Sequence, residues 1–550
     1  MLADEIKKIT SEVSTDEATL NKYSEDYSIF KVMPQAVVSP KNKEEVKALV
    51  RFASEKKKKG KNVSLTARSA GTDMSGGPLG ESIIVEFTKY FNHIREIGAD
   101  YSVVEPGVYY RDFEKKISER GLLYPPYPAS KDLCAIGGIV NNNSGGEKTL
   151  KYGKTEDYVE GLEMILADGE EYYLKPLAGA ELKKQLAEKS FLGEIYRKLF
   201  KLIEDNYEII KAAKPKVSKN SAGYYLWNVY PPAQAGDKKT FDITKLIVGS
   251  QGTLGLVTAA KLRLIKKQKY SRLIVVFSKS LQPVPDIVKT ILPFKPESIE
   301  SYDDKTLQLA VRFLPALLKL MKGSAFKMFF KFLPEVGMIL RGGIPKMIIL
   351  ISISSDDEEE LEKEAGKIKA ALEPFPVQVR VVTDPAEAES FWTIRRQSFN
   401  LLHSNAKGMY AAPFIDDLVI DPKHMPEFLP AVNAILDKYK DKLIYTIAGH
   451  PGNGNFHIIP LVNLKDEATR ALIPAITKEV TDLVLKYGGS ITAEHNDGLI
   501  RTPYLKDMYG EKIVSLFAEV KKIFDPQNIF NPGKKVGADL AYAKAHLKRG

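Results

Sequence analysis

Ala67-Arg68-Ser69-Ala70-Gly71-Thr72-Asp73-Met74-Ser75-Gly76-Gly77 is the stretch of sequence that decides the fold of this 550-residue chain. It directly follows a strand-like segment at residues 62–66. Glycine and other small residues after a strand let successive backbone N–H groups turn inward and hold an anion such as a pyrophosphate. Taken alone, such a stretch is more typical of a tight turn, so its meaning depends on the rest of the chain.

Three further glycine-rich segments follow in the first half of the chain. They are Pro126-Tyr127-Pro128-Ala129-Ser130 with Gly137 to Gly146, then Tyr152-Gly153 with Gly161 and Ala167-Asp168-Gly169, and finally Val248-Gly249-Ser250-Gln251-Gly252-Thr253-Leu254-Gly255. Between them, β-branched runs at 83–87, 102–105, 162–166 and 246–248 predict strands, and residues 112–120 predict a helix that ends at Gly121. This is an α+β pattern in which glycine loops, rather than helices, connect successive elements.

The spacing of glycines also indicates how the chain is divided. Glycine density falls after residue 267, where strand and helix segments such as 347–353 and 356–372 alternate, and glycine and histidine return from residue 449 onward. We therefore expect an N-terminal arm at 1–30, a first domain at 31–267, a second domain at 268–487, and a segment at 488–550 that returns to the first domain.

Composition and charge exclude several classes of protein. Hydrophobic residues make up 44% of the chain, and the 80 Lys and Arg exceed the 70 Asp and Glu by ten. The acids are interspersed with the bases, so this charge predicts ordinary solvated surface rather than a nucleic-acid site. The single cysteine, Cys134, excludes internal disulfides and cysteine-held clusters. The acidic N-terminus and the absence of a run of ~20 apolar residues favour the cytoplasm.

One segment, residues 307–347, is rich in bases and apolar side chains and contains a single acid, Glu335. This pattern is compatible with peripheral contact with an anionic membrane, on the inner face of the cell membrane. We favour the alternative, a helical insertion that packs on its own domain.

Common catalytic signatures are absent from the sequence. Gly452-Asn453-Gly454 lacks the third glycine of the dinucleotide fingerprint, and Glu147 separates the preceding glycines from Lys148-Thr149, so there is no P-loop. The chain also lacks G-x-S-x-G and H-E-x-x-H. The sequence therefore gives no motif support for a nicotinamide-dependent enzyme, a nucleotide hydrolase or a serine hydrolase.

The four glycine segments, in this order and spacing, resemble the FAD-binding domain of the vanillyl-alcohol oxidase / p-cresol methylhydroxylase (PCMH) superfamily. The resemblance implies a discontinuous FAD-binding domain of two subdomains and an α+β cap domain with an antiparallel sheet. It assigns FAD binding to Arg68, Ser69, Ala70, Gly71, Thr72, Asp73, Ser75, Gly76, Gly77, Ser130, Gly137, Gly138, Asn142, Gly145, Gly249, Gly252 and Gly255. Some members bind flavin covalently through a histidine of the first loop. Here that loop has none, which predicts non-covalent FAD and a merely buried Cys134.

Two histidine motifs lie in the last fifth of the chain. Gly449-His450-Pro451-Gly452-Asn453-Gly454-Asn455-Phe456-His457 places two imidazoles around a glycine turn, and Ser490-Ile491-Thr492-Ala493-Glu494-His495-Asn496-Asp497-Gly498 supplies a carboxylate and a third imidazole. Two histidines and a carboxylate make a ligand set that leaves a divalent metal open to substrate. Either motif alone is as readily explained by histidines that hydrogen-bond a loop.

Together the two motifs resemble the D-lactate, D-2-hydroxyglutarate and glycolate dehydrogenase branch of the superfamily. The resemblance implies that His450, His457 and Glu494 bind Zn²⁺ or a similar metal and that His495 is the catalytic base. It also implies that Arg395, in Phe391-Trp392-Thr393-Ile394-Arg395-Arg396, holds the substrate carboxylate, the alternative being a surface salt bridge. We therefore expect oxidation of a D-lactate-like D-2-hydroxy acid, with hydride transfer to flavin N5.

Several points stay open at this stage. Ala412-Pro413-Phe414-Ile415-Asp416-Asp417 and Asn496-Asp497 depart from better-known members, so the substrate side chain is not fixed. With one cysteine, electrons must pass to a separate acceptor, which could be an iron–sulfur subunit, electron-transferring flavoprotein, a cytochrome, a quinone or oxygen. The alternatives are a metal-free alcohol or sugar oxidase of the same superfamily, or a basic membrane- or nucleic-acid-binding protein.

Overall fold

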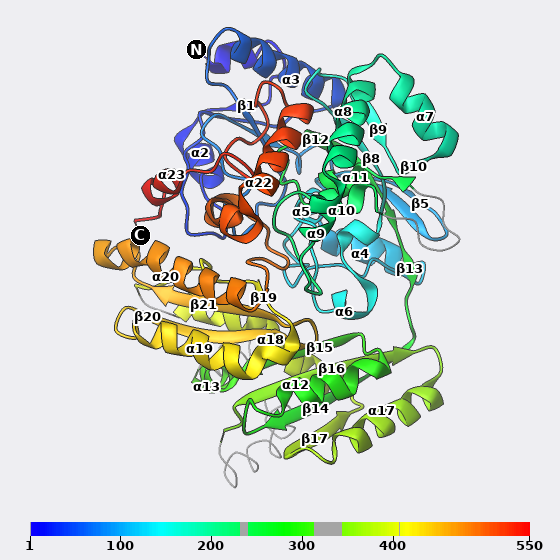
Figure 1. Ribbon diagram of the computed structural model, residues 1–550, viewed down its shortest axis with the longest axis vertical. Coiled ribbons are helices and arrows are strands. Elements are labelled where there is room, and N and C mark those ends of the chain that lie inside the picture. The colour runs from blue at the N-terminus through cyan, green and yellow to red at the C-terminus, as the bar shows by residue number, and fades with distance from the viewer. Residues whose placement is uncertain (1, 232–239, 313–343, 406–407, 550) are drawn as a thin grey trace.

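A computed structural model of the protein describes residues 2–231, 240–312, 344–405 and 408–549. The chain forms two layers of mixed helix and sheet, one above the other in Figure 1. The predicted α+β class with an antiparallel sheet in the second part is confirmed. Most of the segment at 307–347 lies outside the described residues, so its contact with a membrane stays a prediction.

The first glycine loop begins where one strand of a small four-stranded sheet ends. Its strands lie in the order β1 (Val13–Ser14), β2 (Ala36–Val38), β4 (Ile83–Glu86) and β3 (Leu65–Arg68), with β2, β4 and β3 parallel. Helix α3 (Lys43–Lys58) packs Val46, Leu49 and Val50 against this sheet. Its last turn carries Lys56, Lys57 and Lys58, where cations suit the helix dipole.

A second, five-stranded antiparallel sheet holds the other glycine loops. Its order is β5 (Ile94–Ile97), β6 (Tyr101–Val104), β12 (Leu256–Arg263), β8 (Val159–Ile165) and β9 (Glu171–Leu174). Helices α4 (Tyr110–Ser118), α5 (Ile136–Asn142) and α8 (Phe191–Asp205) contribute to the same hydrophobic core. The remaining short elements of this half are α1 (Leu2–Ile6), α2 (Glu17–Tyr23), β7 (Leu122–Leu123), α6 (Thr149–Tyr152), β10 (Leu177–Ala178), α7 (Gly179–Ala187), α9 (Tyr207–Ala212), α10 (Leu226–Val229), β11 (Thr240–Phe241) and β13 (Ile265–Lys266).

One predicted strand is wrong. Residues 246–248 were expected to be extended because Leu, Ile and Val favour strands, but the chain forms helix α11 (Thr244–Ile247) there. The Asp242 carboxylate accepts hydrogen bonds from the backbone N–H and the hydroxyl of Thr244. This local turn starts the helix, and it outweighs the β propensity of a run of only three residues.

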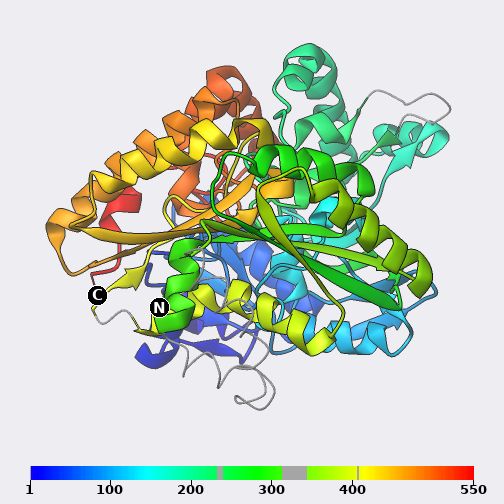
Figure 2. The same cartoon turned by 90° about the horizontal axis from the view of Figure 1, so that it is seen from below.

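The second part of the chain forms one antiparallel eight-stranded sheet. Seven strands follow the order β17 (Val377–Val382), β14 (Tyr270–Ser278), β16 (Met347–Ser355), β15 (Ser298–Asp303), β20 (Leu443–His450), β21 (Asn455–Val462) and β18 (Tyr410–Ala411), and β19 (Leu418–Val419) also pairs with β21. Helices α12 (Val284–Ile291), α17 (Glu358–Leu372), α19 (Met425–Asp437) and α20 (Glu467–Lys486) cover one face, while α13 (Asp304–Arg312) and α18 (Pro385–Asn405) lie on the other (Figure 2).

The C-terminal segment packs back on the first part of the chain. Helix α22 (Leu505–Phe524) contacts α8, and α21 (Gly498–Arg501) and α23 (Leu540–Ala545) lie on either side of it in sequence. The backbone N–H of Leu65 donates to the carbonyl of Ile529 at 2.7 Å, so the segment extends the edge of the first sheet. The domain boundaries at 30, 267 and 487 stay predictions.

Among the described residues, no helix has both the length and the apolar character needed to cross a bilayer.

Candidate active site

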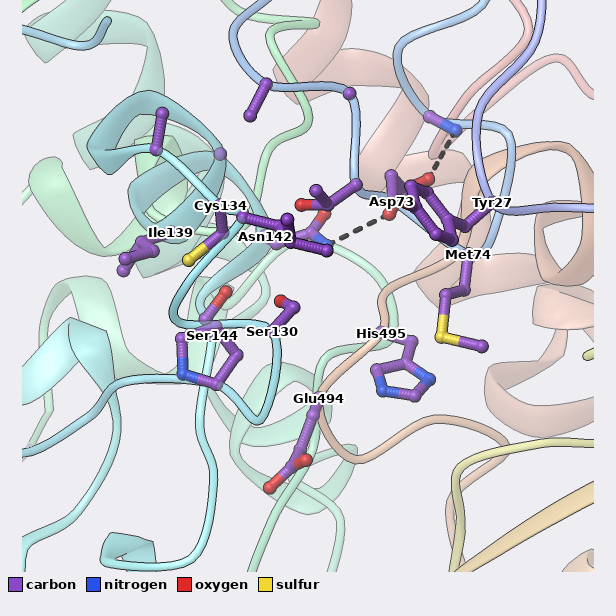
Figure 3. Close-up of a pocket in the computed structure, with 18 of the residues that line it drawn as sticks. Tyr27, Asp73, Met74, Ser130, Cys134, Ile139, Asn142, Ser144, Glu494 and His495 are labelled. Carbon is purple, nitrogen blue, oxygen red and sulfur yellow. Dashed lines mark hydrogen bonds between the residues drawn. The ribbon is translucent and has the colours of Figure 1, made fainter. Parts of the chain in front are cut away.

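A cavity of about 590 Å³ lies where the glycine loops meet the eight-stranded sheet (Figure 3). Most of the residues predicted to bind FAD line it, namely Arg68, Ser69, Ala70, Gly71, Thr72, Asp73, Gly77, Ser130, Gly137, Gly138, Asn142, Gly145, Gly252 and Gly255. The other three, Ser75, Gly76 and Gly249, are not among the lining residues. The same cavity is lined by Arg395, His450, His457, Glu494 and His495, so the structure brings the predicted cofactor and catalytic residues to one place.

Asp73 holds the first glycine loop in shape. Its carboxylate accepts the backbone N–H groups of Ser75 at 3.0 Å and Gly77 at 2.7 Å, and the amide of Asn142 at 3.0 Å. Figure 3 shows the last of these bonds, which joins the first loop to helix α5. One side chain therefore fixes two of the predicted cofactor loops relative to each other.

Arg68 connects the same loop to the N-terminal arm of the chain. Its guanidinium donates to the carbonyl oxygens of Tyr23 at 3.0 Å and Glu25 at 2.7 Å, in the N-terminal arm. A Cβ on Gly71 would lie 2.4 Å from the Arg68 guanidinium, and Gly71 has a φ of +70°. The positive φ favours glycine at this position, and a side chain there would also displace the Arg68 guanidinium.

The glycines of α5 test whether the loops fit a dinucleotide. A Cβ on Gly137 would lie 2.5 Å from the Ser69 hydroxyl, so the two loops pack closely, whereas a Cβ on Gly138 would meet no atom within 4 Å. The backbone at Gly138 is thus open to the cavity, as close approach of a large ligand requires. Nearby Cys134 is buried, and burial raises the pKa of its thiol to about 12, so it is a small hydrophobic residue here. The residues present fit FAD.

Three donor atoms face one another at the cap side of the cavity. Nε2 of His450 lies 3.2 Å from Nε2 of His457, and Oε2 of Glu494 lies 3.6 Å and 3.8 Å from these two nitrogens. Donors bound to one tetrahedral zinc ion lie about 3.3 Å apart. The chemistry and the spacing of these donors therefore fit a divalent metal with a position left for substrate.

Each of the three donors is held from its other side. Glu300 contacts Nδ1 of His450, Asp416 lies 3.1 Å from Nδ1 of His457, and Lys219 lies 2.6 Å from Oε1 of Glu494. Such contacts fix the ring orientation and leave Nε2 and Oε2 for a metal. Lys219, fully buried, also keeps the pKa of Glu494 well below its usual range despite burial.

His495 stands next to this cluster, and its ring stacks on that of His457 at 5.1 Å. Its Nδ1 lies 2.8 Å from Oδ2 of Asp416, so Nε2 is the nitrogen left for a ligand. Burial opposes the charged imidazole, but Asp417 and Asp416 outweigh it and raise the pKa of His495 to about 9. The same carboxylates would stabilise the imidazolium that forms when His495 accepts a proton.

Asp417 is close enough to His457, Glu494 and His495 to be considered a fourth metal donor. Its Oδ2, however, accepts the backbone N–H groups of Ala493, Glu494 and His495 at 2.7–2.9 Å. We interpret Asp417 as the residue that shapes the loop carrying Glu494 and His495, rather than as a ligand.

Arg395 lines the cavity from helix α18, and its guanidinium lies 3.3 Å from Oε2 of Glu300. The neighbouring Arg396 makes a two-oxygen contact with Glu147 at 2.9 Å and 3.0 Å. Of the two arginines, Arg395 is therefore the one that lies beside the donor atoms of His450, His457 and Glu494. It shares the Glu300 carboxylate with His450.

Comparison with known protein families identifies both parts of the chain. Residues 34–174 match the FAD binding domain, and residues 267–535 match the C-terminal domain of FAD linked oxidases. The chain belongs to the FAD-linked oxidase family. The predicted superfamily and its dehydrogenase branch are confirmed.

Relatives of this FAD-linked oxidase include enzymes with different named substrates. D-2-hydroxyglutarate dehydrogenase of Pseudomonas putida is 28% identical over 95% of this chain and 50% of its own length. D-lactate dehydrogenase of Archaeoglobus fulgidus is 27% identical over 97% and 98%, and glycolate oxidase subunit GlcD of Bacillus subtilis is 27% identical over 93% and 90%. The chain spans about half the length of the D-2-hydroxyglutarate dehydrogenases it matches first.

Solved structures confirm the fold of this FAD-linked oxidase. 4-Ethylphenol oxidase from Gulosibacter chungangensis superposes with a TM-score of 0.68, at 17% identity over 97% of this chain and 96% of that one. p-Cresol methylhydroxylase superposes with a TM-score of 0.64 at 16% identity, with the same coverage.

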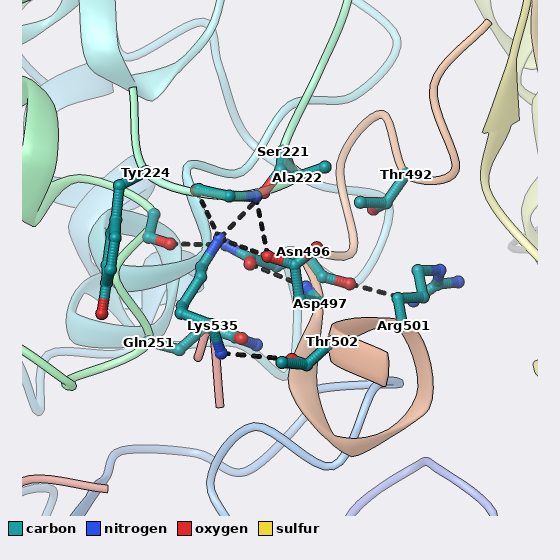
Figure 4. A network of polar contacts seen from close by, with 12 residues as sticks. Ser221, Ala222, Tyr224, Gln251, Thr492, Asn496, Asp497, Arg501, Thr502 and Lys535 are labelled. Carbon is teal, nitrogen blue, oxygen red and sulfur yellow. Dashed lines mark hydrogen bonds and ion pairs between the residues drawn. The ribbon is translucent and has the colours of Figure 1, made fainter. Parts of the chain in front are cut away.

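Asn496 and Asp497, noted above as departures, connect the loop that carries Glu494 and His495 to its surroundings. Asn496 has a φ of +68°, which asparagine tolerates, and its amide donates to the carbonyls of Asn142 and Gly249. Asp497 pairs with Lys535 at 2.8 Å, and both side chains are fully buried (Figure 4). The loop with Glu494 and His495 is thus linked to two cofactor loops and to the C-terminal segment.

Sequence reasoning missed Lys219, Glu300 and the role of Asp416. Asp416 lies in a segment noted for its departure and so carried a weak signal, whereas Lys219 belongs to none of the motifs described above. Glu300 carried none, since it lies within strand β15. The roles assigned to the predicted site residues stay predictions.

Proposed function

We propose that this FAD-linked oxidase is an FAD-dependent, metal-assisted dehydrogenase that oxidises a D-2-hydroxy acid to the 2-oxo acid. The observation that carries the proposal is the triangle of donor atoms from His450, His457 and Glu494, which lies beside His495 in the cavity lined by the glycine loops. Relatives named as D-2-hydroxyglutarate and D-lactate dehydrogenases support the substrate class and the D configuration.

The bound groups would supply two kinds of chemistry: FAD accepts a hydride at N5, and a divalent cation such as Zn²⁺ lowers the pKa of a hydroxyl group. His450, His457 and Glu494 would hold the cation, and the glycine loops would hold FAD without a covalent bond. A cation next to His495 would also lower the pKa of that imidazole.

The residues of the chain would carry out binding and proton transfer. Arg395 would bind the substrate carboxylate, for which the planar guanidinium is suited. His495 would take the hydroxyl proton at Nε2 while Asp416 stabilises the charge that develops on the ring. The hydrogen on C2 would leave as a hydride, with its electron pair. Together with the hydroxyl proton taken by His495, this accounts for the two electrons and two protons that the oxidation removes.

The two electrons would then pass to a separate acceptor. These 550 residues contain one cysteine, which is too few to hold an iron–sulfur cluster. An iron–sulfur subunit, electron-transferring flavoprotein, a cytochrome or a quinone would serve. We place the reaction in the cytoplasm, with peripheral contact at the membrane if the acceptor is a quinone.

Anaerobic bleaching of the bound flavin tests the proposal. A panel of D- and L-2-hydroxy acids is mixed with the holoenzyme, with His495→Ala, and with the control His93→Ala, whose histidine side chain is 71% exposed. We expect bleaching by D acids, an about 10²–10⁴-fold slower rate in His495→Ala, and no change in His93→Ala. Chelator-resistant bleaching at an unchanged rate would instead favour the metal-free oxidase.

A further inference from the structure

The sheet face that carries the metal-donor histidines continues into an uncharged wall. In the β20–β21 register, Ala448 lies opposite His457 and Thr446 lies opposite Ile459. Side chains two residues apart on a strand share a face, so Thr446, Ala448 and Ile459 stand on the same face as His450 and His457. All three line the cavity, and we call them the side-chain wall.

The side-chain wall is where the substrate substituent must lie. In the proposed function, Arg395 and the donor cluster would take the carboxylate and hydroxyl of a 2-hydroxy acid, and the glycine loops would hold the cofactor on the other side of the cavity. The C3 substituent is then left facing the strands. Ala448, which has the smallest side chain of the three, lies opposite His457, and the pair Thr446 and Ile459 lies two residues further along the strands.

The wall offers no charge to a second carboxylate. Among the described side chains that line the cavity, the cations apart from the histidines are Arg68, Arg395 and Arg396. Arg396 is held by Glu147, and Arg68 is held by backbone carbonyls on the cofactor loop. Arg395 is assigned to the first carboxylate and lies beside Glu300.

We infer that the substrate is a monocarboxylic 2-hydroxy acid with a short, uncharged side chain, rather than a dicarboxylic acid. The inference rests on the proposed function. A second carboxylate, three bonds from C2 in 2-hydroxyglutarate, would be placed against Thr446, Ala448 and Ile459, with no cationic partner among the described residues that line this end of the cavity. Burying an ionised group in such a place is strongly disfavoured. The side-chain wall is thus the specificity-determining part of the site.

The kinetics of flavin reduction by the holoenzyme test this inference. D-lactate and D-2-hydroxybutyrate are compared with D-2-hydroxyglutarate and D-malate. We expect kcat/KM for the monocarboxylic acids to be at least about thirtyfold higher. Equal or faster reduction by D-2-hydroxyglutarate would overturn the inference while leaving the proposed function intact. Reduction by none of the acids would overturn the proposed function itself.

A pair of variants tests the wall directly. Ile459→Arg places a cation at the half-buried end of the wall, and Ile459→Gln is the neutral control of similar length. We expect Ile459→Arg to raise the ratio of kcat/KM for D-2-hydroxyglutarate to that for D-lactate by about tenfold or more, and Ile459→Gln to leave the ratio near that of the parent. An unchanged ratio in the folded, flavin-loaded Ile459→Arg variant would contradict the role of the wall.

Discussion

Nζ of Lys219 lies 2.6 Å from Oε1 of Glu494; the lysine side chain is fully buried, and that of Glu494 is 6% exposed, on the cavity side. The contact uses one carboxylate oxygen of Glu494 and leaves the other, Oε2, facing His450 and His457. A lysine charge buried next to a metal ligand is costly unless it is paired. Its position is therefore best explained by the need to orient Glu494.

Lys219→Met should weaken metal binding. The variant removes the partner of Oε1 and lets the carboxylate rotate, so we expect an about 10–100-fold loss of zinc affinity in a chelator competition. Lys219→Arg, which keeps the charge, should recover part of the affinity. Full zinc affinity in a correctly folded Lys219→Met variant would show that the contact plays no part in orienting Glu494.

Glu300→Gln should affect metal and substrate together. Glu300 contacts Nδ1 of His450 and also lies 3.3 Å from the Arg395 guanidinium. We expect an about tenfold or greater loss of zinc affinity and a higher KM for the hydroxy acid. The matched control is Glu297→Gln on the same chain segment, whose carboxylate pairs instead with Lys148. If Glu297→Gln lowered zinc affinity as much, the effect would not be specific to Glu300.

Asp497→Asn should destabilise the fold. It leaves the buried ammonium of Lys535 without its ion-pair partner, a change that costs about 3–5 kcal/mol. Thermal unfolding of the holoenzyme measures the effect. Asp482→Asn breaks the exposed pair between Lys478 and Asp482 and should change stability by less than about 0.5 kcal/mol. Similar shifts in the two variants would contradict a structural role for the buried pair.

Asp26 should make stability depend on pH. Burial, and then the charge of Asp73, raise the pKa of Asp26 from 3.8 to about 7 in the fold. Folding therefore favours the neutral carboxyl group. Its contribution to the free energy of unfolding is complete below pH 3.8 and is lost as the pH rises through 7.

Asp26→Asn removes this titration. The melting temperature of the variant, relative to the parent protein, should rise between pH 5 and pH 8.5 by an amount equivalent to about 1–3 kcal/mol. Asp26 also accepts the backbone N–H of Gly76, so absolute stability can fall at both pH values. The test is therefore how the difference in stability between variant and parent changes from pH 5 to pH 8.5. A pH-independent difference would contradict the raised pKa.

The sequence was informative wherever the chemistry is local in the chain. The glycines of the first loop and the pair His450 and His457 each lie within a few residues of their partners, so they form recognisable motifs, and the order of these motifs carried the resemblance that predicts FAD and metal binding. The strand at 246–248 was wrongly predicted because the apolar run was considered by itself. Asp242, which lies outside that run, accepts the N–H of Thr244 and starts a helix there.

The supporting residues could not be predicted because their partners are distant in sequence. Glu300 meets His450 across 150 positions, and Lys219 meets Glu494 across 275. Neither residue belongs to a motif, and a lysine or glutamate in a sequence is far more often solvated than buried. Only the pairing of β15 with β20, and the return of the C-terminal segment, brings them to the site.

The proposed mechanism requires that His450, His457 and Glu494 hold a divalent metal and that His495 takes the hydroxyl proton of the 2-hydroxy acid while the flavin accepts the hydride. Its most direct test is single-turnover anaerobic flavin reduction by D-lactate in three samples of the holoenzyme: zinc-loaded, chelator-treated, and chelator-treated with zinc restored. We predict bleaching that falls by at least about tenfold on zinc removal and returns on restoration. Equal bleaching rates in all three samples, with flavin still bound, would contradict the claim.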